Sequence, residues 1–431
     1  MVGSIILQII RLSFHIYVSN KISSEALGVF NLIMTIYMFG ITLASSGINI
    51  SCMRVVSEEL AFSNFVGVKK SSKKCIVISL CISVIASFLF YINADNISKY
   101  AFQGKVSQNI VYLICFALPL ISMSSAISGY FVAVRRVYKN VIGQFLEQIS
   151  KFVIIYIFFN RFSDGSLENS CFLLILGDVF SEVVCFVYSL AVYNFDIYYH
   201  FSNTKPKSNE NFLFRICKIL FPVALTSYIK SALSTLKQLL IPTGLEKSGK
   251  NTKEAFSEYG LITGIAMPIV MFPATFLVAF ANLLIPEFSR YYVKKDYSKI
   301  KIYTDKILVA SFAFSVVLSV VFYIFAYDLG VAIYNNYKVG IYIKLFSLLM
   351  PFMYVDIIID NILKGLDAQT NVVVINVIDL IVTTSFIFFF VPILGVKGYI
   401  LSIFISEILN LSLSLKKLLD LERNFKWIFL L

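Results

Sequence analysis

The sequence predicts an all-α polytopic membrane protein with about twelve transmembrane helices. Of its 431 residues, 58% are hydrophobic and 14% are charged, and the mean hydropathy is +0.81. Soluble domains contain roughly 45–50% apolar and about 25% charged residues. Apolar content is therefore high and charge is low, as expected for a chain whose surface faces lipid. The apolar residues also form continuous runs of about 20 residues, the length that a helix needs to cross the hydrocarbon layer.

Twelve stretches have the length and composition of a membrane span. They are 2–19, 28–50, 75–94, 110–133, 141–160, 171–193, 217–242, 259–285, 307–327, 342–363, 371–392 and 398–415.

One longer polar stretch, 194–216, divides these spans into six and six. We therefore expect an N-terminal lobe at 1–193 and a C-terminal lobe at 217–431, joined by this segment as a linker. Of the 37 lysines and arginines, 23 follow even-numbered spans or lie in the C-terminal tail, and 10 lie in the odd loops. Because basic loops stay in the cytoplasm, both termini and the linker are predicted to be cytoplasmic, in a protein of the cell membrane. The basic loops also account for the net charge of +12, so no nucleic acid is expected as a partner.

The two halves of the chain are related by an internal repeat with an offset of 232 residues. At this offset, 74–94 and 306–326 are identical at 10 of 21 positions without a gap. The same offset pairs Gly28 with Gly260 and also aligns isolated proline and acidic positions. Six spans per repeat is an even number, so both halves enter the membrane in the same direction. Two parallel six-helix lobes are the layout of transporters in which one lobe moves against the other.

No motif for catalysis or for a bound cofactor is present. The chain has neither GxxxxGK[ST] nor a GxGxxG that follows a strand, so no nucleotide site is expected. The seven cysteines lack the spacing of a metal or disulfide framework. We predict no enzyme activity, no cofactor and no metal site.

Four basic residues in or beside the apolar spans are candidates for substrate binding, because a charge there costs about 2.5–3.5 kcal/mol on insertion scales. They are Arg11, Arg54, Lys230 and Lys237. Lys230 and Lys237 are seven residues apart and share one helix face. We expect all four to line a central cavity, although Arg54 lies near a span end, from which it can instead extend to the interface.

Acidic residues in the spans are candidates for ion coupling or for structural pairing. Glu147 is four residues before Lys151, a spacing that favours a structural ion pair over a ligand. Asp356 and Asp360 have the same spacing. Two acids one turn apart can hold a proton or a sodium ion, or can instead cap or pair across helices, and both interpretations stay open. Asp379, at the position of Glu147 in the repeat, is the fourth candidate.

Several segments resemble the stage V sporulation protein B family of polysaccharide-biosynthesis flippases. This family belongs to the multidrug/oligosaccharidyl-lipid/polysaccharide exporter superfamily. The segments are LASSGINISCMRVVSEE (43–59), GYFVAVRRVYKNVIGQFLEQISK (129–151), FPVALTSYIKSALSTLKQLLIPTGLEKSG (221–249), YGLITGIAMPIVMFPATFLVAFANLLIPEFS (259–289) and the stretch 360–410.

The resemblance implies a MATE-like fold and transport by alternating access. The implied substrate is a lipid-linked oligosaccharide or a peptidoglycan precursor such as lipid II, which would cross the cytoplasmic membrane for cell-wall synthesis or sporulation. The four basic residues would bind its pyrophosphate. Membrane lipid and cell-wall synthesis proteins would be the partners.

Two other functions stay open. One is a cation-coupled antiporter of drugs or metabolites in the same superfamily, for which acids and aromatics are expected to dominate the cavity. The other is a membrane scaffold of a wall-synthesis complex that does not transport.

Overall fold

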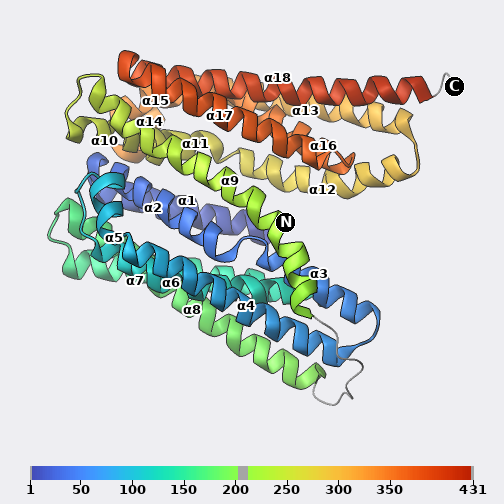
Figure 1. Cartoon of the computed structure of the whole chain (residues 1–431). Coiled ribbons are helices and arrows are strands. Elements are labelled where there is room, and N and C mark those ends of the chain that lie inside the picture. The colour runs from blue at the N-terminus through green and yellow to red at the C-terminus, as the bar shows by residue number, and fades with distance from the viewer. Residues whose placement is uncertain (1, 202–211, 429–431) are drawn as a thin grey trace. The chain divides into compact units, whose positions relative to one another are not determined.

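The computed structural model describes residues 2–201 and 212–428, and within these ranges the chain is helical with no strand (Figure 1). This confirms the predicted fold class. In the described ranges, nine helices are long and apolar enough to cross a membrane, or eleven spans if each of two bent helix pairs counts as one.

The helices of the first half of the chain are α1 (Val2–Lys21), α2 (Ser24–Ser45), α3 (Ile48–Ala61), α4 (Phe65–Ile92), α5 (Ala94–Asn96), the π-helical η1 (Ile97–Ala101), α6 (Asn109–Ala133), α7 (Val137–Phe162) and α8 (Leu167–Phe201). The helices of the second half are α9 (Phe212–Lys247), α10 (Thr252–Leu261), the π-helical η2 (Ile262–Ala266), α11 (Met267–Met271), α12 (Ala274–Val293), α13 (Tyr297–Ile324), α14 (Ala326–Tyr334), α15 (Tyr337–Ser347), α16 (Met350–Gly365), α17 (Gln369–Leu394) and α18 (Val396–Ile428).

Three spans that the sequence predicts as continuous are broken at glycine or proline. Gly47 has a φ of 79° and separates α2 from α3. Pro273 lies between α11 and α12, where the axis bends by 55°. Pro351 lies in the first turn of α16, which bends by 53° from α15. Proline has no N–H to donate and its ring obstructs the preceding turn, so it is tolerated where a new helix starts.

The helices extend further than the predicted spans, at the expense of the loops. α4 begins at Phe65, so the basic residues from Lys69 to Lys74 lie on its first turns and not in a loop. α8 and α9 likewise extend into the predicted linker, and the rest of that linker, 202–211, lies outside the described residues. The sequence underestimates these helices because polar helix ends lie beyond the apolar run.

The helix boundaries follow the 232-residue offset of the sequence repeat. α4 and α13 each have 28 residues, and both their first and their last residues are 232 positions apart. α7 and α17 each have 26 residues and obey the same offset at both ends.

The turns between these helices repeat as well. Among the described residues, six other than glycine have positive φ, and they form three pairs at the same offset: Ser63 (54°) with Lys295 (55°), Gln103 (52°) with Asn335 (48°), and Arg135 (61°) with Asp367 (60°). Asn64 caps α4 and Asp296 caps α13, each through its side-chain oxygen. Left-handed φ is uncommon for non-glycine residues, so this correspondence extends the repeat to backbone geometry.

The chain groups into two compact units. The N-terminal unit is Val29–Thr235, and the C-terminal unit is Met1–Gly28 with Leu236–Leu431. In the N-terminal unit α4 packs on α6 and α7 on α8, and in the C-terminal unit α17 packs on α18 (Figure 1). These units assign α1 to the second half and most of α9 to the first, unlike the sequential lobes expected above. The lobe boundaries at 193 and 217 stay a prediction.

A close backbone contact joins the two glycines paired by the repeat. A methyl group on Gly28 would overlap the carbonyl oxygen of Phe256, and a methyl group on Gly260 would overlap that of Ser24. Phe256 and Ser24 are themselves 232 positions apart, so the contact between α2 and α10 is reciprocal. Only glycine permits backbones to approach this closely.

Candidate functional site

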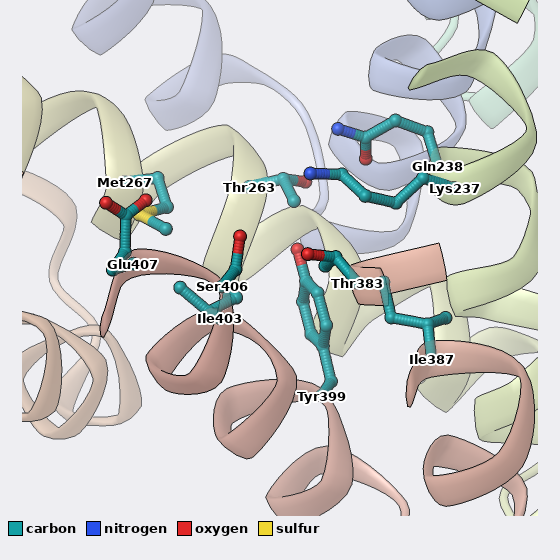
Figure 2. A pocket seen from close by; sticks show the side chains of 10 residues that line it. All are labelled: Lys237, Gln238, Thr263, Met267, Thr383, Ile387, Tyr399, Ile403, Ser406 and Glu407. Carbon is teal, nitrogen blue, oxygen red and sulfur yellow. The ribbon is translucent and has the colours of Figure 1, made fainter. Parts of the chain in front are cut away.

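The C-terminal unit contains a cavity of about 220 Å³ between candidate membrane spans. Its lining comes from α9, η2, α11, α17 and α18, and consists of Lys237, Gln238, Thr263, Met267, Thr383, Ile387, Tyr399, Ile403, Ser406 and Glu407 (Figure 2).

The cavity wall carries one amino group, one carboxyl group and several hydroxyls. The Lys237 side chain extends toward Thr263, while Glu407 lies beside Met267 (Figure 2). Lys237 and Glu407 interact electrostatically. Tyr259 donates a hydrogen bond of 2.8 Å to Gln238 and so fixes that amide at the cavity wall. Such a lining can bind both an anionic group and sugar hydroxyls.

The helices α16 and α17 carry three carboxylates that accept hydrogen bonds from side chains of α18. Asp379 accepts from Ser406 at 2.6 Å and from Thr383 at 3.2 Å. Because Ser406 and Thr383 also line the cavity, Asp379 is one hydrogen bond away from it.

Asp356 and Asp360 are bonded to α18. Asn410 donates to Asp356 at 2.8 Å, and Ser414 donates to Asp360 at 3.5 Å. Glu407 interacts electrostatically with both Asp356 and Asp379. Three of the four acidic candidates therefore gather in one unit.

The fourth candidate, Glu147, belongs to a polar cluster in the N-terminal unit. Its carboxylate accepts a hydrogen bond of 3.0 Å from Gln148. On the same helix Lys151 forms an ion pair with Asp178 of α8, and only 14% and 11% of these two side chains are exposed. Glu147 and Asp178 also interact electrostatically with Glu182. The pairing of Lys151 across two helices cannot be read from spacing along one helix.

Of the four basic candidates, only Lys237 lines the cavity. Arg11 is exposed on α1. Arg54 is exposed on α3 and pairs with Glu58 at 3.2 Å. Lys230 is half-buried on α9, in the part of that helix that belongs to the N-terminal unit. Convergence of the four on one cavity stays a prediction.

Sequence reasoning missed two ion-pair networks at helix ends. Asp196, fully buried on α8, pairs with Arg136 of the α6–α7 turn and with Lys139 on the first turn of α7, and it accepts from Tyr130 at 2.8 Å. Glu258, on α10, pairs with Lys250 at 3.2 Å and accepts a hydrogen bond from the Tyr342 hydroxyl. None of these partners is three or four residues away on the same helix, so helical spacing does not predict them.

Replacement of Lys151 by methionine should lower the free energy of unfolding by about 3–5 kcal/mol, because it leaves the Asp178 carboxylate buried without its partner. The double variant Lys151→Met/Asp178→Leu should recover most of this loss. The matched control is Lys99→Met, whose partner Asp95 lies at 2.6 Å but is 59% exposed, so the loss should be much smaller. Unfolding in mixed detergent micelles measures all three, and equal losses for Lys151→Met and Lys99→Met would contradict the assignment.

Comparison with known proteins identifies a matching family and a related sequence. The sequence profile of the family described as polysaccharide biosynthesis protein matches residues 1–292. Stage V sporulation protein B of Bacillus subtilis (strain 168) is 20% identical over 398 residues, which cover 90% of this chain and 76% of that protein.

Two kinds of solved structure have a similar fold. An inward-facing multidrug resistance MATE family transporter of the MOP superfamily matches with a TM-score of 0.71 at 13% identity, covering 97% of this chain and 95% of the other. The lipid II flippase MurJ, in an inward closed conformation, matches with a TM-score of 0.72 at 11% identity, covering 97% and 86%. The fold is therefore MATE-like, and the profile match over most of the sequence shows that the chain belongs to the polysaccharide biosynthesis protein family.

Proposed function

We propose that this protein is a flippase that moves a lipid-linked oligosaccharide or a peptidoglycan precursor across the cell membrane by alternating access. The observation that carries the proposal is an intramembrane cavity, lined by an ammonium group and hydroxyls, in a member of the polysaccharide biosynthesis protein family. The names of two similar proteins, a sporulation protein and a lipid II flippase, support a substrate used in the cell envelope.

The chemistry of the cavity suits a phosphate-linked sugar. Lys237 offers a charge-assisted hydrogen bond to a phosphate oxygen. Thr263 and Thr383 donate their own hydrogens to Tyr259 and Asp379, so their oxygens can accept from sugar hydroxyls, and the Tyr399 hydroxyl can donate as well as accept. The volume of about 220 Å³ is below the roughly 300–1,000 Å³ of most small-molecule sites. The cavity therefore accommodates part of a head group in this conformation.

The other basic candidates extend this proposal to a pyrophosphate. Arg11, Arg54 and Lys230 are expected to contact the head group at some stage of transport. Their positive charge in or near apolar spans is costly, and an anionic substrate offsets that cost.

The carboxylates of α16 to α18 favour a second candidate, a cation-coupled antiporter of drugs or metabolites. A positively charged substrate would pair with Glu407 at the cavity wall. The two functions differ in the sign of the charge that the cavity binds, so replacement of Lys237 separates them.

Removing positive charge should slow flipping. Lys237→Gln should reduce the initial rate about tenfold or more, because a hydrogen bond to a charged group contributes about 1.5–3 kcal/mol and 1.4 kcal/mol is a factor of ten. Arg11→Ala and Lys230→Ala should have the same effect. The measurement is leaflet-resolved accessibility of a labelled lipid-linked oligosaccharide in proteoliposomes.

The matched control is Lys253→Gln, which removes an exposed lysine at the start of α10 and should leave flipping unchanged. Normal transport by the Lys237, Arg11 and Lys230 variants would show that these residues are structural. Faster export of cationic drugs by Lys237→Gln, without any flipping by the parent protein, would favour the antiporter.

The orientation of the chain belongs to the same proposal. Loops after even-numbered spans, the linker and both termini are expected in the cytoplasm. In a background without the seven native cysteines, cysteine at exposed Lys295 should react with an impermeant thiol reagent only after the membrane is opened. Cysteine at exposed Ser163, in an odd loop, should react in intact cells. The reverse pattern would overturn this topology.

A further inference from the structure

Asp356 and Asn410 form a hydrogen-bonded pair in which each side chain has one oxygen without a hydrogen-bond partner. The amide nitrogen of Asn410 donates to Oδ2 of Asp356 at 2.8 Å. The other two oxygens, Oδ1 of Asp356 and Oδ1 of Asn410, are buried and accept no hydrogen bond. Asp356 is only 7% exposed, and it lies in the second helix of the bent candidate span α15–α16.

A single proton satisfies both of these oxygens. In Asp356 the two carboxyl oxygens share one carbon, and in Asn410 the amide oxygen and nitrogen share one carbon. The terminal torsions of Asp and Asn are broad, so the two groups can rotate to face each other. A proton on Oδ1 of Asp356 converts that acceptor into a donor, and the Asn410 carbonyl is the acceptor beside it. The carboxylic acid and the amide then close a ring with two hydrogen bonds. A buried polar atom left without a partner costs about 1–3 kcal/mol, so the ring stabilises the protonated form.

The internal repeat identifies the corresponding residues of the N-terminal unit, where a lysine neutralises a buried aspartate. The 232-residue offset assigns Asn410 to the position of Asp178, and Thr383 to the position of Lys151. In the N-terminal unit, the Lys151 ammonium pairs with Asp178 and is a fixed, covalently attached cation. In the C-terminal unit the corresponding residue is an uncharged threonine. Over the described residues, no lysine or arginine forms an ion pair with Asp356.

The charges around Asp356 are mostly negative. The ionisable groups that interact with it electrostatically are Asp360 and Lys364 on α16, Asp379 on α17 and Glu407 on α18. A further negative charge among these carboxylates is unfavourable in a medium of low dielectric constant. Protonation of Asp356 removes one of these negative charges and supplies the hydrogen of the second hydrogen bond in the ring.

We propose that Asp356 binds an exchangeable proton, which closes the ring with Asn410, and that this proton is the coupling ion of transport. The second part rests on the flippase function proposed above, and the first part does not. Release of the proton opens the ring and leaves a carboxylate that accepts from the side chains of Asn410 and Ser414. The state of the ring can thus bias the packing of α16 against α18, which are in direct contact.

Infrared spectroscopy of the full chain in lipid tests the proton site without any transport. A carbonyl stretching band of a protonated carboxyl group should be present at low pH and disappear as pH rises. Other carboxyl groups in the spans, such as Glu407 and Glu182, contribute to this region of the spectrum, so the readout is the titrating component that Asp356→Asn removes. The matched control Asp360→Asn, one turn along the same helix, should retain it. Asn410→Leu should shift its frequency, because the carboxyl group loses its ring partner.

A titrating band of unchanged intensity in Asp356→Asn would overturn the proton site. Loss of the band on addition of sodium at constant pH would also overturn it, in favour of a sodium site.

Flipping by the same proteins tests the coupling. In the parent protein the flipping rate should depend on pH. Asp356→Asn keeps the ring, because its amide can donate to Asn410, but it cannot release a proton, so its rate should lose that dependence. If the band titrates as expected but flipping by Asp356→Asn follows pH as in the parent, the coupling is wrong and the proton site stands. If the parent protein does not flip the lipid at all, the proposed function fails while the infrared result still decides the proton site.

Discussion

A charged side chain in hydrocarbon costs about 2.5–3.5 kcal/mol on insertion scales, and lipid offers it no hydrogen bond. The spans of this protein contain such groups in both units. Lys151 and Asp178 balance each other's charge directly. Asp379 instead receives two hydroxyl hydrogen bonds, from Ser406 and Thr383. Within the N-terminal unit α7 packs on α8, and within the C-terminal unit α16 and α17 pack on α18, so these polar contacts lie between helices that also bury apolar surface.

The two units compensate the charge of a buried acid in different ways at positions related by the repeat. The N-terminal unit contains a lysine and an aspartate on neighbouring helices, so its charge balance is permanent. The C-terminal unit contains Thr383 and Asn410 at those places and has the acid, Asp356, on a third helix. The charge of Asp178 is therefore neutralised by the fixed cation of Lys151, whereas the proposed proton neutralises Asp356. A difference of this kind permits one unit to remain rigid while the other responds to pH.

Composition and hydropathy predict the fold class, and the 232-residue self-match predicts the repeat that reappears in α4 and α13. The helix breaks were visible as Gly47, Pro273 and Pro351, but apolar content alone does not locate them. The site is less predictable. Lys237 was found because a base in an apolar run is unusual, whereas Ser406, Tyr399 and Asn410 look like ordinary span residues. Their roles depend on helix packing, which brings together residues that are distant in sequence.

The central claim is that flipping of the saccharide lipid and movement of a proton are one process. Its most direct test is the pH inside proteoliposomes, followed with an enclosed dye while the labelled lipid crosses the membrane. The account predicts a proton flux that begins with flipping, stays in constant proportion to it and disappears in Asp356→Asn. Flipping by the parent protein at an undiminished rate with no change of internal pH would contradict it.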